Sequence, residues 1–268
     1  MEARACPVCG GDGGEVALQF EADPWQVVRC AGCGMVFLAN PPSYEAVASE
    51  YAWTDSIEVE HEQRVKREKT LHQIQAMLAP LRRRMRPNKL RRLFRAHFAG
   101  RTVIDLGCGN GRRLFKGLDG EAMGITPLGI DIEAAAAEQA RLAFERRGGG
   151  AWAGPVSEIL GGWPPQSADG ALLYAYLEHE MQPGRVLDQL HRVLEPRSPV
   201  IIKVPNHGCF NRRVRGRRWC GYRLPDHVNY FTPATLRALL RRAGYTIVRC
   251  RWFDHGPFND NMWMVADR

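Results

Sequence analysis

The chain has 268 residues and a formal net charge of +8, with 45% hydrophobic and 25% charged side chains. These ordinary values exclude disorder, collagen-like repetition and a coiled coil as overall descriptions. No window approaches 18 consecutive apolar residues, and no basic start precedes an apolar run, so we expect neither a transmembrane helix nor a secretory signal. The sequence therefore predicts a cytoplasmic protein with one substantial α/β domain and a small addition.

The charge is divided unevenly along the chain. Residues 1–60 carry two basic and ten acidic side chains, whereas the rest of the chain carries 35 basic and 19 acidic ones. Residues 82–101 hold nine basic side chains and no acidic one. An acidic N-terminal region, badly suited to gripping a phosphate backbone, is thus attached to a basic body.

Four of the eight cysteines come in two closely spaced pairs. Cys6 and Cys9 in CPVCG, with Cys30 and Cys33 in CAGCG, form the pattern C-x2-C-x20-C-x2-C. Four thiolates close a tetrahedron around one ion, so the pattern predicts a structural zinc. The segments VALQF and WQVVRC between the pairs favour short strands and hence a zinc ribbon. A redox C-x-x-C motif is the alternative, but such a motif is normally single.

Three regions are expected in chain order. Residues 1–40 form the ribbon, 41–98 a helical linker or lid, and 99–268 the main domain, with an Arg-rich aromatic insertion at 206–231. In the main domain short apolar strands alternate with amphipathic helices, which is typical of βαβ units and a parallel sheet. Strands are expected at 101–106, 127–132, 151–154, 169–177, 198–205, 245–253 and 261–267. Helices are expected at 112–118, 133–147, 182–194 and 232–244. The predicted fold class is α/β: a Rossmann-like, doubly wound, mostly parallel seven-stranded sheet with a small N-terminal zinc ribbon.

The strongest chemical signal is the segment VIDLGCGNGR. Gly107, Gly109 and Gly111 separate a buried strand from a helix, where glycine permits a sharp turn and a close approach of the backbone to a ligand. The nicotinamide pattern G-x-G-x-x-G fails, because the third glycine comes one residue early. Asp131, twenty residues after Gly111, ends the next strand, where an acid accepts both hydroxyls of a ribose. A helix N-cap is the structural alternative for Asp131.

Asp105 and these glycines match the motif D-x-G-x-G-x-G, and the chain here resembles the class I S-adenosylmethionine-dependent methyltransferases. One subgroup also carries L-E-H, V-P-N and P-x-H-x-x-Y-F-T, which are met in YAYLEHE, IIKVPN and PDHVNYFT. Several of its members begin with a C-x-x-C ribbon. Residues 195–198, EPRS where the subgroup has K-P-G-G, depart only in a surface turn.

The resemblance implies that the glycine loop wraps the amino-acid part of S-adenosylmethionine and that Asp131 holds its ribose. It implies an adenine contact near Val156 and Ser157, although an acid common at that place is missing. The cofactor-binding residues expected on this basis are Asp105, Gly107, Cys108, Gly109, Gly111, Asp131, Ile132, Val156 and Ser157.

Candidate catalytic residues follow the strand at 169–177. Glu178 and His179 lie at its carboxyl end, which faces the ligand crevice in such sheets. We expect His179 to act as a base or to orient the acceptor, with His227 second; His227 and Tyr230 would close over the crevice. A structural hydrogen bond is the alternative for His179, and packing of the insertion is the alternative for the other two. Some relatives bind a divalent metal through E-x-x-E-H, but the first glutamate is Ala175 here, so no catalytic metal is predicted.

The acceptor is left between two classes. The subgroup favours a small metabolite, such as a sugar, a natural-product intermediate or a cell-envelope intermediate, and the arginines suggest an anionic one with a phosphate or nucleotide handle. The alternative is RNA, including ribosomal RNA, held by residues 82–101 and the insertion. The acidic ribbon favours the small acceptor. A noncatalytic zinc-ribbon adaptor is a third class, opposed by the intact glycine loop. No membrane partner is expected, and the oligomeric state is left open.

Overall fold

A computed structural model describes residues 4–11, 16–44, 46, 89–115 and 123–268. Most of the helical linker predicted at 41–98 lies outside these residues. The part that is described contains α4 (Lys89–His97), which buries Leu90, Leu93 and Phe94 on one side. The helix therefore forms where the apolar residues recur at helical spacing.

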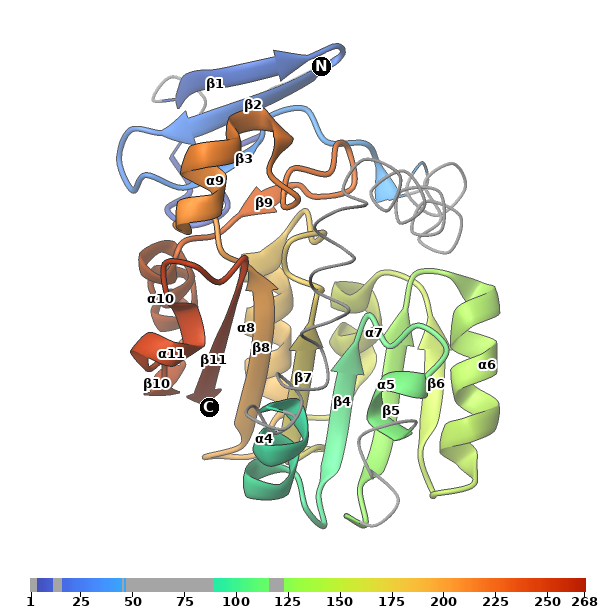
Figure 1. The fold of residues 1–268 in the computed structure, drawn as a ribbon. Helices are drawn as coiled ribbons and strands as arrows, with labels where there is room; N and C mark the ends of the chain where they lie inside the picture. Colours follow the sequence, from blue (N-terminus) through green and yellow to red (C-terminus); the bar gives the residue numbers. More distant parts are fainter. Residues whose placement is uncertain (1–3, 12–15, 45, 47–88, 116–122) are drawn as a thin grey trace, which may run out of the picture.

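The main sheet has seven strands, as predicted, and the structure shows their order to be β10-β11-β8-β7-β4-β5-β6 (Figure 1). Its strands are β4 (Thr102–Leu106), β5 (Thr126–Asp131), β6 (Gly150–Ala153), β7 (Gly170–Tyr174), β8 (Pro199–Pro205), β10 (Thr246–Arg249) and β11 (Asn261–Asp267). Neighbouring pairs from β8 to β6 are parallel, and β11 runs antiparallel to both of its neighbours. The carboxyl ends of the parallel strands thus meet at one edge, where ligands bind in open α/β sheets.

Helices cover both faces of this sheet. They are α4, α5 (Arg112–Phe115), α6 (Ala134–Glu145), α7 (Val156–Gly162), α8 (Pro183–Val193), α10 (Pro233–Arg242) and α11 (Trp252–His255). Side chains alternate between the faces, so Ile104 and Leu173 share a core with α7, α8 and α10. Val103 and Leu172 share a second core with α4 and α6. The result is the three-layer arrangement typical of a doubly wound fold.

A second sheet of four strands lies above the carboxyl edge of the main sheet, and its strand β2 ends at Cys30 (Figure 1). It consists of β1 (Val16–Ala22), β2 (Trp25–Cys30), β3 (Val36–Leu38) and β9 (Asn229–Tyr230) in that order. The strand β9 comes from the insertion predicted at 206–231, which also contains α9 (Phe210–Arg215) and the 3-10 turn η2 (Gly216–Arg218). The insertion therefore completes the sheet that the N-terminal segment begins.

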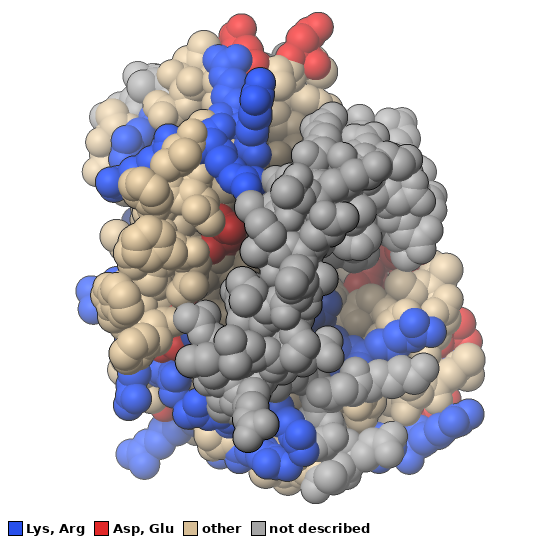
Figure 2. Space-filling model, in the orientation of Figure 1, with Lys and Arg blue, Asp and Glu red and all other residues tan. Residues whose placement is uncertain are grey.

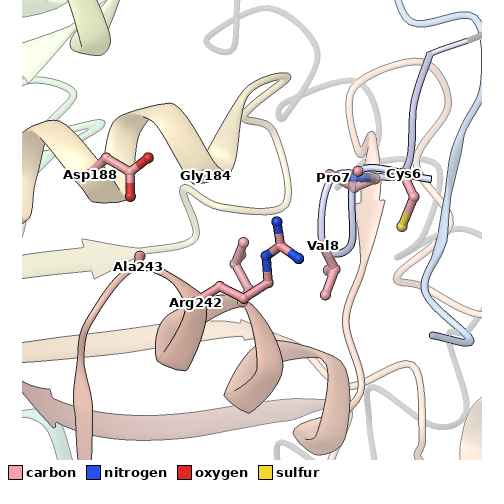
Figure 3. A pocket seen from close by; sticks show the side chains of 9 residues that line it. Cys6, Pro7, Val8, Gly184, Asp188, Arg242 and Ala243 are labelled. Atoms are coloured by element: carbon pink, nitrogen blue, oxygen red, sulfur yellow. The ribbon is translucent and has the colours of Figure 1, made fainter. Parts of the chain in front are cut away.

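Both faces of β3 in this second sheet are buried. Met35 and Phe37 belong to the core that contains α8 and α10, whereas Val36 and Leu38 pack with Trp219 and other residues of the insertion. The first C-x-x-C turn also contacts the main domain: Figure 3 shows Arg242 projecting from α10 toward this turn, and its Nη1 donates to the carbonyl of Cys9 at 3.4 Å. The N-terminal sheet is thus integrated with the main domain on two sides.

Two local differences separate the expected strands from the observed ones. The strand expected at 245–253 ends at Arg249, because Asp254 caps a short helix there by accepting from the backbone N–H of Arg251 at 2.9 Å. The strand expected at 169–177 ends at Tyr174, because Ala175 adopts a left-handed φ of 54° that no strand continues. This early turn places Glu178 and His179 in a loop at the carboxyl edge.

Candidate functional site

The glycine loop turns tightly between β4 and α5. Gly107 has φ 69°, a conformation that residues with a side chain rarely adopt. A Cβ at this position would also lie only 3.1 Å from Cδ2 of Tyr176, so both the backbone and the space favour glycine. Gly109 has φ 52°, but a Cβ at Gly109 would have no atom within 4 Å. The loop therefore packs closely against the protein at Gly107 and presents an open side at Gly109, where a ligand can approach the backbone.

Asp131, at the carboxyl end of β5, is joined to this loop. Its Oδ2 accepts from the backbone N–H of Gly109 at 2.7 Å, and its Oδ1 accepts from the N–H of Glu133 at 3.0 Å. Burial raises the pKa of the Asp131 carboxyl, and the backbone donors act in the opposite direction. The second bond closes a turn before α6, whose N-cap residue is Glu133, so the structure does not show the N-cap role considered for Asp131. The first bond places the carboxylate against the glycine loop.

Asp105 is buried beneath the loop, with 2% of its surface exposed. Its Oδ2 has no hydrogen-bond partner among the described residues. Burial raises the pKa of this carboxyl to about 7, although Arg113 opposes the rise. An orphaned carboxylate oxygen beside a glycine loop fits a ligand that brings a positive charge or a hydrogen-bond donor.

The other predicted cofactor residues surround the same edge. Cys108 is buried, and burial raises the pKa of its thiol, so it packs as a small apolar residue. Val156 and Ser157 are buried at the start of α7. The N–H of Gly154, two residues before Val156, donates to the carbonyl of Asp131 at 2.9 Å, which brings this helix start beside the end of β5. Ile132 directly follows β5 and is half-buried.

His179 forms a pair with Asp226 that the sequence did not predict. Its Nδ1 lies 2.8 Å from Oδ1 of Asp226 and 3.0 Å from the carbonyl oxygen of the same residue, so Nδ1 carries the donated hydrogen. Burial by itself lowers the pKa of His179, but the Asp226 carboxylate raises it above its ordinary value. Burial likewise raises the pKa of Asp226, and His179, the strongest of the groups that oppose burial, brings it down to about 2. The carboxylate is therefore ionised, and it orients the ring of His179.

His227 and Glu178 lie beside this pair. The ring of His227 is edge-on to that of His179, with centroids 4.7 Å apart, and its Nδ1 lies 2.8 Å from the carbonyl of Gly221. Burial lowers the pKa of His227 well below its ordinary value, so this ring is neutral. Burial raises the pKa of Glu178, whose Oε2 has no hydrogen-bond partner among the described residues. Glu178, His179 and His227 each bring one ligand-type atom within 4.8 Å of the others.

Tyr230, three residues after His227, is held by packing. It is 1% exposed and packs in the core formed by the insertion and the N-terminal sheet, with its ring 4.9 Å from that of Tyr222. Its hydroxyl has no hydrogen-bond partner among the described residues. This is the packing role considered as the alternative for Tyr230, and a catalytic role for it stays a prediction.

The loop that carries Glu178 and His179 is held by the strand β9 segment. The carbonyl of Glu178 accepts from the N–H groups of Val228 and Asn229 at 2.8 and 3.0 Å. The side-chain amide of Asn229 donates to the carbonyls of Leu177 and Glu180 at 2.8 and 2.6 Å. These bonds fix both ends of the loop, so the positions of His179 and Asp226 depend on each other.

Glu180 was also missed by the sequence reasoning. It is 4% exposed, and its carboxylate accepts from the hydroxyls of Tyr44 and Tyr176 and from the N–H of Gln182, the last at 2.7 Å. Tyr176 is the residue that touches Gly107. A second acid directly after L-E-H, in an otherwise apolar run, was the available signal. Glu180 thus connects the residues after the N-terminal sheet with the glycine loop.

Cations border the carboxyl ends of β7 and β8. The guanidinium of Arg113 lies 3.8 Å from the ring centroid of Tyr174, and the ammonium of Lys203 lies 4.8 Å from the same centroid. Arg223 forms an ion pair with Asp226 at 3.1 Å. The carboxyl edge of the sheet therefore combines three buried acids, Asp105, Glu178 and Glu180, with positive charges beside them.

The four N-terminal cysteines converge as a metal site requires. Their sulfur atoms all lie within 4.8 Å of one another, with Cys6 to Cys33 and Cys9 to Cys30 each at 3.5 Å, and all four are free thiols. Tetrahedral zinc with Zn–S bonds of about 2.3 Å places sulfur atoms ~3.8 Å apart, so the donor set and its spacing fit zinc. In each turn the glycine after the second cysteine, Gly10 or Gly34, donates its N–H to the carbonyl of the first cysteine at 2.9 Å.

Residues 72–249 match a family model described as a methyltransferase domain. The chain belongs to this family. Curated relatives include two ubiquinone biosynthesis O-methyltransferases. The one from Paraburkholderia phytofirmans is 25% identical over 179 residues, which are 64% of this chain and 76% of the relative. The one from Thiobacillus denitrificans is 28% identical over 180 residues, 65% of this chain and 76% of the relative.

Solved structures agree on the fold. An S-adenosylmethionine-dependent methyltransferase from Mesorhizobium loti aligns with a TM-score of 0.51 at 17% identity, covering 64% of this methyltransferase and 93% of that chain. Together with the family model, this identifies the protein as a class I S-adenosylmethionine-dependent methyltransferase, the family the sequence motifs resemble. Among the described residues, no helix of this methyltransferase is both long and apolar enough to cross a membrane.

Proposed function

We propose that this methyltransferase transfers a methyl group to a hydroxyl of a small anionic metabolite, and that His179 is its general base. The metabolite classes that fit are sugars, natural-product intermediates and cell-envelope intermediates. The observation that carries the proposal is the His179–Asp226 pair at the carboxyl end of β7, with Nδ1 and Oδ1 2.8 Å apart. The names of the curated relatives support an oxygen acceptor.

The residues at the glycine loop suit S-adenosylmethionine. When bound, the cofactor supplies an electrophilic methyl group on a sulfonium sulfur. Asp105 has a buried, unpartnered oxygen among the described residues, which fits the ammonium of the amino-acid part. Gly109 leaves open space for the close approach of a ligand, and Asp131 would hold the ribose hydroxyls. Val156 and Ser157 would contact the adenine.

The base chemistry follows from the hydrogen bonding of His179. Because Nδ1–H is held by Asp226, the neutral tautomer has its lone pair on Nε2. Nε2 would take the hydroxyl proton as the acceptor oxygen forms its bond to the methyl carbon, while the carbon–sulfur bond breaks and its electron pair stays on the sulfur. The Asp226 carboxylate then stabilises the resulting imidazolium, and the proton leaves to solvent. His227 would limit the position of the His179 ring, since its neutral ring packs edge-on at 4.7 Å.

The positive rim supports an anionic acceptor. The guanidinium of Arg113 and the ammonium of Lys203 both lie within 5 Å of the centroid of the Tyr174 ring. Tyr174 ends β7, shortly before Glu178 and His179 in the sequence. A phosphate or carboxylate placed between these cations would hold the acceptor while its hydroxyl faces His179. The N-terminal cysteines would hold a structural zinc, which with four thiolates has no open position for chemistry.

The acceptor class is tested by supplying methyl-labelled S-adenosylmethionine with two pools in parallel, extracted small metabolites and total RNA. Label in an anionic metabolite, lost in His179→Ala, is the expected result. Label in RNA would contradict the proposed small acceptor and would support the alternative, a nucleic-acid acceptor. An exposed variant, Glu158→Gln on α7, is the control for nonspecific loss of turnover.

A further inference from the structure

The side of the molecule formed by α9, α11 and the loop after α11 exposes large apolar side chains. Their exposed fractions range from 49% for Phe210 to 76% for Phe253. The residues of this apolar patch are Phe210, Val214, Trp252, Phe253 and Phe258. Exposure of so many aromatic rings to water is unfavourable, so it indicates a surface that contacts something apolar.

The residues of the patch come from separate segments that contact one another. The rings of Phe210 and Phe258 are 5.8 Å apart, and those of Trp252 and Phe253 are 5.6 Å apart. The side-chain amide of Asn259 donates to the carbonyl of Phe253 at 3.5 Å, which ties the loop to α11. Val214 follows Phe210 by four residues on α9, so the two share a helix face.

The exposed charges on this part of the chain have one sign. Residues 206–268, all of which the structure describes, contain twelve arginines and four aspartates, and none of the four aspartates is exposed. Arg213 on α9, Arg218 on η2 and Arg251 before α11 are exposed. Figure 2 shows a tan area on the side of α9 and α11, with blue side chains above and below it.

We propose that this aromatic–arginine patch docks on an anionic lipid surface. Exposed Trp and Phe side chains enter the boundary between headgroups and acyl chains, and arginines bind the anionic headgroups around them. The charge of the patch decides against a second copy of this chain as the occupant, since two such faces would bring the exposed Arg213, Arg218 and Arg251 of one copy against the same arginines of the other. The sequence did not predict this surface, because its five apolar side chains come from short segments with no common periodicity.

The position of the patch relates it to the catalytic crevice. α9 begins five residues after the carboxyl end of β8, and the side-chain amide of Asn206 donates to the carbonyl of His255 at 3.1 Å. Docking through this side would place the carboxyl edge of the sheet near the lipid surface. The proposal does not depend on the identity of the acceptor, since binding is measured without acceptor or cofactor.

The test is cosedimentation of the full chain with vesicles of phosphatidylcholine alone or with about 30% phosphatidylglycerol. We expect binding to the anionic vesicles that weakens with added salt, and at least about tenfold weaker binding by Trp252→Ser/Phe253→Ser/Phe258→Ser. Arg213→Gln/Arg218→Gln should also bind about tenfold more weakly.

Matched controls separate the patch from general effects. Leu142→Ser removes a side chain of α6 that is 53% exposed outside the patch, and Arg92→Gln/Arg146→Gln removes two exposed charges outside it. Both controls should bind like the parent chain. Absence of binding to anionic vesicles, or equal losses in the controls, would overturn the proposal. A dimer in light scattering that the triple variant dissociates, without vesicle binding, would assign the patch to a second copy instead.

Discussion

Nδ1 of His179 lies 2.8 Å from Oδ1 of Asp226, which follows it by 47 residues in the chain. The two residues come from different loops, and the bonds from Val228 and Asn229 to the Glu178 carbonyl hold those loops together. Substitutions at this pair therefore test both the proposed base and the contact between the two loops that hold it.

Asp226→Asn is expected to change the pH dependence of turnover. His179 accepts a proton only when neutral, so kcat rises with pH through its pKa, which the Asp226 carboxylate holds above 6.5. Removing the carboxylate charge lowers that pKa, moves the acid limb to lower pH and reduces the maximal kcat by about 100-fold. Glu195→Gln, at an exposed position, should leave the profile unchanged. An unshifted acid limb in Asp226→Asn would contradict the role of His179.

Asp105→Asn is expected to raise stability while weakening cofactor binding. The pKa of Asp105 is about 7 in the folded protein and 3.8 ordinarily, so the stability that its carboxyl contributes is complete below pH 3.8 and is lost as the pH rises to about 7. At pH 8 the amide should therefore stabilise the free protein by about 1–3 kcal/mol, with little gain at pH 4.

Thermal unfolding at several pH values, without ligand, measures the first effect of Asp105→Asn. Calorimetric titration with S-adenosylmethionine measures the second, and affinity should fall at least about tenfold because a charge-assisted contact is lost. Stabilisation without any loss of affinity would remove Asp105 from the cofactor site.

Arg4→Met tests the contact between the N-terminal sheet and the catalytic loop. The guanidinium of Arg4 donates to the carbonyls of Val228 and Glu180, each at 3.4 Å, and also to that of Met181. Without it these buried carbonyls lose donors, which should cost about 1–3 kcal/mol of unfolding free energy. Because the carbonyls flank His179, kcat should fall while cofactor affinity changes by less than about twofold.

Arg29→Met is the matched control for Arg4→Met, since Arg29 is an exposed arginine of the same sheet. It should retain parental kcat. Equal losses of kcat and cofactor affinity in Arg4→Met would show general unfolding and not a displaced loop.

Metal analysis of the purified protein should find one zinc per chain. Cys33→Ser is expected to lose this zinc and to unfold at a lower temperature, because the four thiolates close the site together. Cys220→Ser, outside the cluster, should keep the full content. Metal that persists in Cys33→Ser would point to the three ligand-type atoms of Glu178, His179 and His227.

The sequence predicted the main sheet well, because its strands and helices follow local periodicity. The capped helix α10 illustrates this: Thr232, Pro233 and Gly244 define its ends by local chemistry. The glycine loop and Asp131 were predictable for the same reason, since both lie at strand ends that the pattern defines.

The parts that escaped prediction depend on contacts between distant segments. β9 has two residues and no periodicity, so nothing local showed that Asn229 and Tyr230 would join a sheet begun by the N-terminal segment. In the sequence Asp226 looks like an ordinary turn residue, and only the fold brings it into contact with His179. The burial of Tyr230 follows from the pairing of β9 with β3, because this pairing packs its side chain in the core formed by the insertion and the N-terminal sheet.

The pairing of β3 with β9 has a consequence for how the protein is made. Phe37 leaves the ribosome about 190 residues before its partner Asn229, so during synthesis the strand β3 has an open edge until Asn229 has been made. A product terminated before residue 228 would keep that edge permanently. Such fragments should self-associate, and the N-terminal segment expressed alone should do the same.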